Sequence, residues 1–121
     1  MSDIILVEIE DRYKPVATDQ DIQVSVTVGN AHASASMILL DKKFLSANGT
    51  AVIGQGPSVL RKRTVISATV LDAKGEANWP SVTVTFTENG QQKVFGPYSK
   101  EAKADQGTIC YFIQILNTND V

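Results

Sequence analysis

The chain has one histidine and one cysteine among 121 residues, so it is poor in the side chains that most often carry catalysis or bind metals. Nucleophilic catalysis on serine or cysteine usually needs a histidine base, and His32 lies among small residues at the start of a predicted strand. Cys110 lies between Ile109 and Tyr111 with no basic neighbour in sequence, so we expect a small buried hydrophobic residue rather than a nucleophile. These absences predict that the protein is not an enzyme.

Long apolar runs and an excess of positive charge are also missing. No run approaches the roughly 18 apolar residues of a membrane span, and the apolar run at 4–7 is too short for a secretory signal. With 11 basic and 13 acidic residues, the net charge of −2 predicts no nucleic-acid partner. If Met1 is the native start, the expected location is the cytoplasm, where a lone cysteine stays reduced.

The chain is instead rich in β-branched residues. Valine, isoleucine and threonine fill 33 of 121 positions, against 7 leucines. Such side chains pack well on a pleated sheet and poorly in a helix. Apolar and polar residues alternate over 20–28 and 81–88, which predicts half-buried strands. Over 108–116 both faces are mostly apolar, which predicts a strand at the centre of a sheet or at an interface.

Glycine and asparagine turns separate these runs, and only 42–46 and 99–103 have the composition of a single helical turn. Short strands without crossover helices predict an all-β fold in one domain over residues 1–121. We expect an antiparallel β-sandwich with immunoglobulin-like or related Greek-key topology. Its seven or eight strands are predicted at 3–10, 20–28, 33–40, 50–53, 59–72, 81–88, 92–97 and 108–116.

The turn at 88–90 allows two hairpin registers. A two-residue loop would place Lys93 opposite Phe86. A three-residue loop with a glycine bulge would place Val94 opposite Val84. We expect the three-residue loop, because it keeps apolar residues on one face of the hairpin.

One stretch is similar to a known family. Residues 66–87 contain a strand, then the turn Asp72-Ala-Lys-Gly75, then the alternating strand Val82-Thr-Val84-Thr-Phe86. This stretch resembles bacterial immunoglobulin-like domains of invasin and intimin type. The resemblance implies a sandwich fold, although the chain differs from that family in having neither an export signal nor a repeat.

Aromatic residues near strand ends are candidates for binding. Trp79 and Tyr98 lie beside prolines, where a ring could stack on a sugar, anchor a partner or close the end of the sandwich. If Tyr111 faces the core, then Phe112 and Leu116 lie on the outer face of the C-terminal strand. A subunit contact would cover these two side chains.

The run at 61–63 is the one basic cluster. Within the predicted strand, Arg61 and Arg63 would share one face. Their charge either protects an edge strand from pairing with another sheet or offers a docking point for an acidic partner.

No cofactor is expected, because the chain has neither a phosphate-binding glycine loop nor the ligand spacing of a zinc site. Calcium is the metal that the loops could hold, through oxygens pooled from several connections. The same acidic and asparagine side chains also favour loops by bonding to nearby backbone. The residues concerned are Asp19, Asp21, Asp72, Asn117, Asn119 and Asp120.

Two functions therefore stay open. The first is a non-catalytic interaction or assembly module that binds a protein partner or a second copy of the chain. The alternative is a carbohydrate-binding, lectin-like domain that uses Trp79 and Tyr98, with or without calcium. We favour the first, because catalytic groups are lacking and the strand at 108–116 is apolar on both faces.

Overall fold

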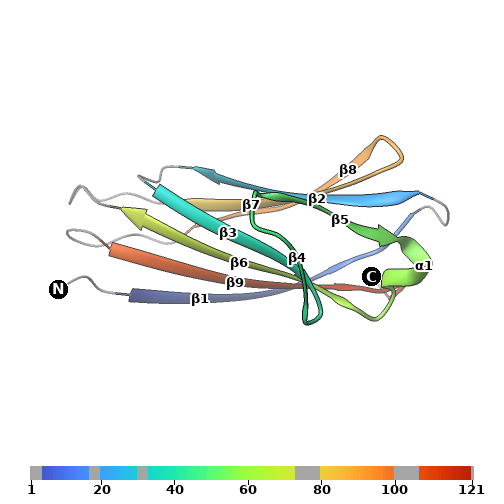
Figure 1. Cartoon of the computed structure of the whole chain (residues 1–121), viewed down its shortest axis with the longest axis horizontal. Helices are drawn as coiled ribbons and strands as arrows, with labels where there is room; N and C mark the ends of the chain where they lie inside the picture. Colours follow the sequence, from blue (N-terminus) through green and yellow to red (C-terminus); the bar gives the residue numbers. More distant parts are fainter. Residues whose placement is uncertain (1–3, 17–19, 30–32, 73–79, 100–106, 121) are drawn as a thin grey trace.

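Two β-sheets face each other in the computed structural model, which describes residues 4–16, 20–29, 33–72, 80–99 and 107–120 (Figure 1). The described part holds nine strands and one short helical turn. In chain order these are β1 (Ile4–Tyr13), β2 (Asp21–Gly29), β3 (Ala33–Leu40), β4 (Lys43–Ser46), β5 (Thr50–Gln55), α1 (Gly56–Val59), β6 (Arg63–Asp72), β7 (Ser81–Glu88), β8 (Gln91–Ser99) and β9 (Gly107–Asn117).

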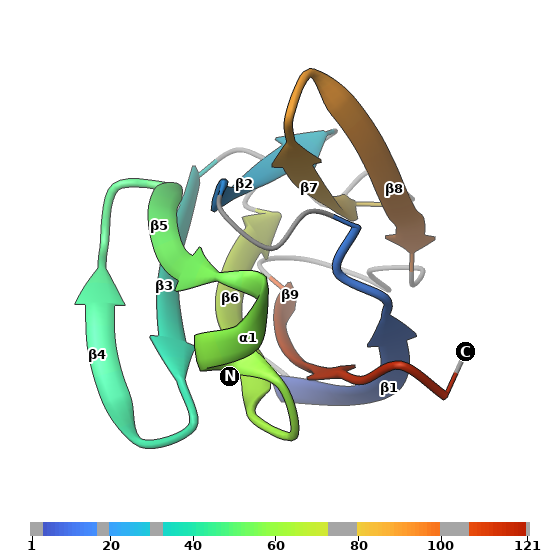
Figure 2. The same cartoon turned by 90° about the vertical axis from the view of Figure 1, so that its right-hand side faces the viewer.

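The larger sheet has five strands in the order β1-β9-β6-β3-β4, and the smaller has four in the order β5-β2-β7-β8. Seen end-on, β1 and β4 form the two edges of the larger sheet (Figure 2). All neighbours are antiparallel except β1 and β9, which run parallel from Ile4 beside Thr108 to Tyr13 beside Asn117. The predicted all-β antiparallel sandwich is confirmed.

The core lies between the two sheets and is built from the alternation seen in the sequence. In β7 and β9 every second residue is buried, so valine and isoleucine from both sheets meet in one cluster. Phe86 and Tyr111 are its largest fully buried apolar side chains. The Tyr111 hydroxyl donates to the Pro80 carbonyl oxygen at 2.8 Å, which satisfies the buried polar group.

One predicted strand was too long at its start. The strand expected over 59–72 begins only at Arg63, because Gly56–Val59 forms a helical turn with Pro57 as its second residue. Arg61 follows that turn with a positive φ of 68°. The segment 42–46, whose composition allows a single helical turn, is largely the edge strand β4, which pairs with β3.

The expected three-residue hairpin loop was also wrong. Phe86 pairs with Lys93, and Asn89 and Gly90 both have positive φ, as a tight two-residue loop requires. The same register places Phe95 opposite Val84, and a bulge between Val82 and Val84 then places Tyr98 opposite Val82. The hairpin therefore keeps an apolar inner face, while the Lys93 ammonium lies 5.8 Å from the centre of the Phe95 ring.

Several predicted features fall outside the described residues, namely Asp19, His32, Trp79, the turn at 73–75 and most of 99–103. Among the residues that are described, no helix is long and apolar enough to cross a membrane.

Candidate functional site

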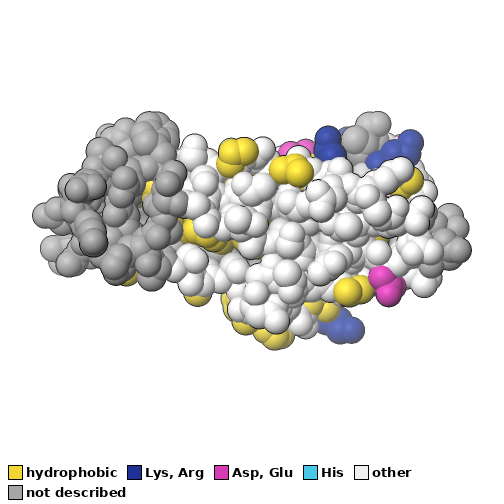
Figure 3. Space-filling model, turned by 90° about the horizontal axis from the view of Figure 1, so that it is seen from above, with side chains coloured by type: hydrophobic (Ala, Val, Ile, Leu, Met, Phe, Trp, Pro, Cys, Tyr) yellow, Lys and Arg dark blue, Asp and Glu magenta, His cyan; other side chains and the backbone are white. Residues whose placement is uncertain are grey.

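The two outer faces of the sandwich differ in polarity. On the smaller sheet, the residues that alternate with buried ones are mostly threonine, serine and glutamine. The space-filling view shows this face as a largely white surface with separate yellow spots (Figure 3). The polar residues are Gln23, Ser25, Thr27, Thr83, Thr85, Thr87 and Gln92, and the apolar exceptions are Val52 and Val94. This is the ordinary pattern for a sheet face in contact with water.

On the larger sheet, the outward residues are mostly apolar, and we call this surface the outer apolar face. The residues that alternate with them along the same strands, such as Ile38, Ile66 and Ile113, are completely buried in the core. The outer apolar face consists of Leu6, Ala35, Met37, Leu39, Phe44, Val65, Leu71, Cys110, Phe112 and Leu116.

Strand register shows which of these side chains are neighbours. In one outward row, Phe112 and Met37 lie on either side of Ser67. In the next outward row, Val65 and Leu39 are neighbours, Phe44 on β4 extends that row to the edge of the sheet, and Gln114 is the β9 neighbour of Val65. Apolar side chains are therefore direct neighbours across β6, β3 and β4, with Ser67 and Gln114 between them and the apolar residues of β9.

Three of these side chains are well exposed. Leu6 is 63%, Met37 44% and Phe44 55% accessible, although all three are large apolar residues. Single exposed apolar residues are normal, whereas a group that spans one sheet face is typical of a binding surface.

The structure brings together three of the residues singled out in the sequence. Tyr111 is 1% exposed, so Phe112 and Leu116 point outward, as the alternation predicts, and both are half-buried. Arg63 pairs with Leu116 at one end of the outer apolar face. Cys110 also lies on this face, with its Sγ 4.0 Å from the Thr69 Oγ1, so the expectation of a buried cysteine was wrong.

Arg61 does not share a strand face with Arg63, which corrects the prediction for the basic cluster. Arg61 lies in the loop after α1, and its backbone N–H donates to the Asn117 carbonyl oxygen. The strand that begins at Arg63, β6, lies between β9 and β3, so its arginine does not protect a sheet edge.

Sequence reasoning missed Met37, Leu39 and Phe44. In β3, Ala35, Met37 and Leu39 alternate with Ser36, Ile38 and Leu40. Ala35, Met37 and Leu39 are more apolar than residues on the solvent-facing side of a strand usually are. This composition was the signal in the sequence for an apolar outer face. Phe44 was missed because no strand was predicted over its segment.

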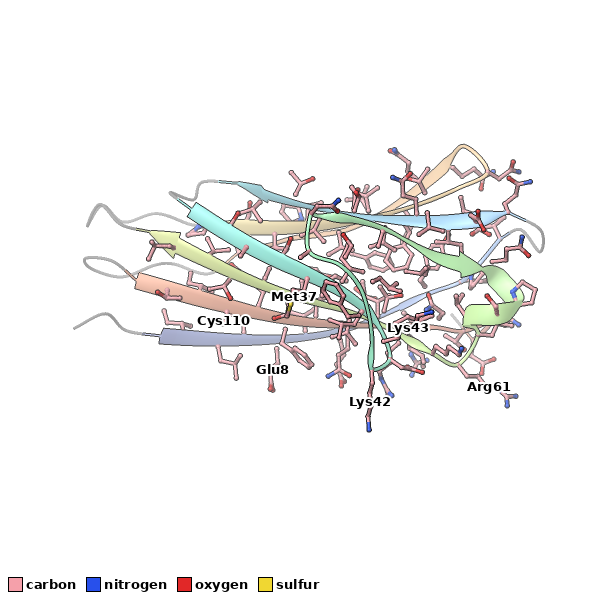
Figure 4. All side chains as sticks on the ribbon, in the orientation of Figure 1. Glu8, Met37, Lys42, Lys43, Arg61 and Cys110 are labelled. Atoms are coloured by element: carbon pink, nitrogen blue, oxygen red, sulfur yellow. The ribbon has the colours of Figure 1, made fainter. Side chains whose placement is uncertain are left out.

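Charged residues of both signs lie at both edges of the larger sheet. Glu8, Glu10 and Arg12 are exposed, outward residues of β1, and Asp41 and Lys42 are exposed at the turn between β3 and β4. Lys43 begins β4 and pairs with Leu40, which packs against the core. Glu8 and Lys42 extend from the same side of the sheet, away from the smaller sheet (Figure 4).

Tyr98 is the second-last residue of β8, so it lies near a strand end as the sequence predicts. Its half-buried ring packs against the core, and its hydroxyl donates to the Asp11 Oδ2 at 3.2 Å. Burial and the nearby Asp11 charge raise the pKa of Tyr98 to about 12. Tyr98 thus joins the edge strands of the two sheets.

A groove of about 320 Å³ lies at the end of the sandwich where β1 ends beside the β7–β8 hairpin. Next to it, the Glu88 carboxylate is 1% exposed and accepts hydrogen bonds from the Tyr13 hydroxyl at 2.6 Å and the Val16 N–H at 2.9 Å. Burial, together with Glu88, raises the pKa of Tyr13 above its ordinary value. These contacts fix the chain where it leaves β1. The groove is lined by Arg12, Tyr13, Lys14, Val16, Gln91, Gln92 and Lys93.

The residues considered for calcium do not converge. Asp72 pairs with Gly107 at one end of β9, whereas Asn117 is at the other end. The Asn117 amide donates to the Lys62 carbonyl oxygen at 3.0 Å and to the Thr64 hydroxyl at 3.2 Å. Within the described ranges, no three histidine, cysteine or acidic residues form a group that could hold a metal ion.

Comparison with known proteins adds no relative: no family model matches the chain, and neither the curated proteins nor the solved structures give a significant match. The assignment of function therefore depends on the surface itself.

Proposed function

We propose that the chain is a non-catalytic interaction or assembly module that binds a protein through the outer apolar face. The observation that supports this is a difference in composition between the two sheets: the outward residues of the smaller sheet are mostly threonine, serine and glutamine, whereas those of the larger sheet include leucine, methionine and phenylalanine beside Ser67, Thr69 and Gln114. An apolar sheet face gains stability when another layer covers it, at roughly 25 cal/mol per Å² of apolar surface removed from water.

The test places a photoreactive benzoylphenylalanine at Met37 on the outer apolar face. Met37 is 44% exposed, so the substitution leaves the core packing in place. We expect irradiation of host cells to give one discrete adduct, because a specific partner covers this position. The adduct should disappear when Phe112→Lys is added, since a lysine in the middle of the face opposes docking.

The matched control carries the same photoreactive residue at Thr85, an outward residue of the smaller sheet. This position should give no discrete adduct. Equal adducts from both positions, or no adduct from position 37, would contradict the proposed function.

A further inference from the structure

We infer that the groove between the end of β1 and the β7–β8 hairpin binds a small organic phosphate monoester. The inference goes beyond the proposed function, because it concerns a different site and a different kind of ligand. The groove has a volume of about 320 Å³, and three basic side chains line it, namely Arg12, Lys14 and Lys93.

Lys93 has an unusual position for a lysine, because it lies on the inner side of the smaller sheet. It pairs with Phe86, which is completely buried, and cross-strand partners lie on the same side of a sheet. The Phe95 ring, with its centre 5.8 Å from the Lys93 ammonium, attracts the cation and restricts where it lies. The inner side of β8 therefore contributes a positive charge to the groove.

The other wall of the groove is also basic. Arg12 lies in β1, and Lys14 directly follows that strand, so both belong to the larger sheet's side of the groove. A single inward lysine on β8 would be enough to protect that edge strand from pairing with another sheet. Three like charges around one groove instead repel one another unless an anion lies between them. The groove therefore favours a negatively charged ligand.

The Glu88 carboxylate offsets one of these charges. It is 1% exposed, and it accepts hydrogen bonds from two residues that line the groove, through the Tyr13 hydroxyl and the Val16 N–H. Three basic side chains and one carboxylate leave two positive charges. The hydrogen bonds to Glu88 also fix the chain at the end of β1 before any ligand binds, so the site is largely formed in advance.

The remaining charge is not neutralised within the described ranges. No acidic residue of these ranges lines the groove, and neither Lys14 nor Lys93 forms an ion pair in them. The Arg12 Nη1 donates to the Asp120 carbonyl oxygen at 3.3 Å, which uses one of the five N–H donors of the guanidinium. Its other side-chain donors remain for a ligand.

A phosphate monoester fits this arrangement better than a carboxylate does. At pH 7 it carries a charge of about −1.5 to −2 and has three strong acceptor oxygens, whereas a carboxylate has one charge and two oxygens. A guanidinium pairs with two phosphate oxygens at once, and ammonium groups bind phosphate as point charges. The dianion thus matches the two positive charges that remain.

The groove also offers a contact for the organic part of the ester. Val16 lines it and is 63% exposed, which is unusual for a large apolar side chain unless something covers it. The ligand would contact side chains from two sheets rather than a glycine-rich loop. The spacing of residues along the chain therefore could not indicate this site.

The experiment titrates the ¹⁵N-labelled full chain with phenyl phosphate and follows the backbone amide signals by NMR. The buffer contains about 0.15 M salt, which screens attraction between distant exposed charges. Phenyl sulfate is the matched ligand, because it has a similar shape and a single negative charge. We expect signals from 12–16 and 91–93 to shift, with a dissociation constant of about 1 mM or below for phenyl phosphate. Phenyl sulfate should bind at least about tenfold more weakly.

Two double variants with the same change in net charge test the position of the site. Lys14→Gln with Lys93→Gln removes two cations of the groove, and Lys42→Gln with Lys43→Gln removes two cations at the turn between β3 and β4. All four side chains are exposed, so both variants should keep the fold, which their Tm values check. We expect the first variant to bind phenyl phosphate at least about tenfold more weakly and the second to stay within about twofold of the unaltered chain.

Other results would overturn the inference. If about 10 mM phenyl phosphate shifts no signal from 12–16 and 91–93, the groove is not a phosphate site. Equal weakening in both double variants would assign binding to net charge rather than to the groove. Equal affinity for phenyl sulfate would reject a phosphate monoester as the ligand. The cross-linking test at Met37 reports on the proposed function separately.

Discussion

At the scale of single residues, the Glu88 carboxylate holds the end of β1 against the β7–β8 hairpin. It is almost fully buried, and it accepts a 2.6 Å hydrogen bond from Tyr13, whose ring lies 4.4 Å from that of Phe86. Tyr13→Phe keeps the ring contact but removes the donor. We expect it to lower the free energy of unfolding by about 1–3 kcal/mol, measured by urea denaturation.

Tyr98→Phe is the matched control for that experiment. Its hydroxyl also donates to a carboxylate, but the Asp11 partner is exposed and the distance is 3.2 Å. We expect a loss below about 1 kcal/mol, because water replaces an exposed hydrogen bond at little cost. Equal losses for the two variants would contradict a special role for the buried contact.

The same two tyrosines predict a pH dependence. The pKa of Tyr98 is raised from 10.0 to about 12, and that of Tyr13 is raised as well, so the folded chain keeps protons that the unfolded chain releases. The stabilisation is complete below pH 10 and falls as pH rises toward about 12. Urea midpoints across this range should decline less steeply for the Tyr13→Phe, Tyr98→Phe double variant than for the unaltered chain.

At the scale of elements, β8 depends on a glycine that no other residue can replace. Gly96 has a φ of +95°, and a Cβ there would lie 2.7 Å from the Tyr98 backbone N and 3.0 Å from the Val82 carbonyl oxygen. Gly90 in the hairpin loop also has positive φ, but a Cβ there meets nothing within 4 Å.

We therefore expect Gly90→Ala to cost about 1–2 kcal/mol of stability, the ordinary cost of left-handed backbone. Gly96→Ala should cost clearly more, because the backbone of β8 must also shift away from β7. Thermal unfolding of both variants measures the difference. Equal shifts in Tm would show that the close contacts at Gly96 relax without cost.

The bounds of the strands show how much of the fold could be predicted from the sequence. Alternation located β2, β3, β7 and β9 to within about two residues, because each has one buried face. Alternation failed to predict the structure where pairing with distant parts of the chain decides the local conformation. The two-residue loop register places Phe95 opposite Val84, and segment 43–46 is a strand because it pairs with β3.

The candidate site was predictable only in part. Phe112 and Leu116 were found because their own strand is apolar on both faces. Met37, Leu39 and Val65 were missed because strand order decides which side chains become neighbours, and strand order is a property of long-range pairing.

At the scale of the whole molecule, binding through the outer apolar face couples association to stability. Any partner that binds only the folded chain raises its Tm in proportion to the logarithm of its concentration. If the partner is a second copy of the chain, the Tm of the unaltered chain rises with protein concentration, and the Tm of Phe112→Lys stays constant. A concentration-independent Tm for both proteins would argue against self-association.

The parallel pairing of β1 with β9 has a consequence for synthesis. Ile4 pairs with Thr108, so the strand of this sandwich that is synthesised first waits for the one that is synthesised last before it can enter the sheet. Contacts between residues so distant in sequence form slowly. Meanwhile Ile5, Val7 and Ile9, which later pack against the core, stay uncovered on the nascent chain. Closure of this sandwich therefore follows the synthesis of β9, and of all the strands β1 stays accessible to chaperones for the longest time.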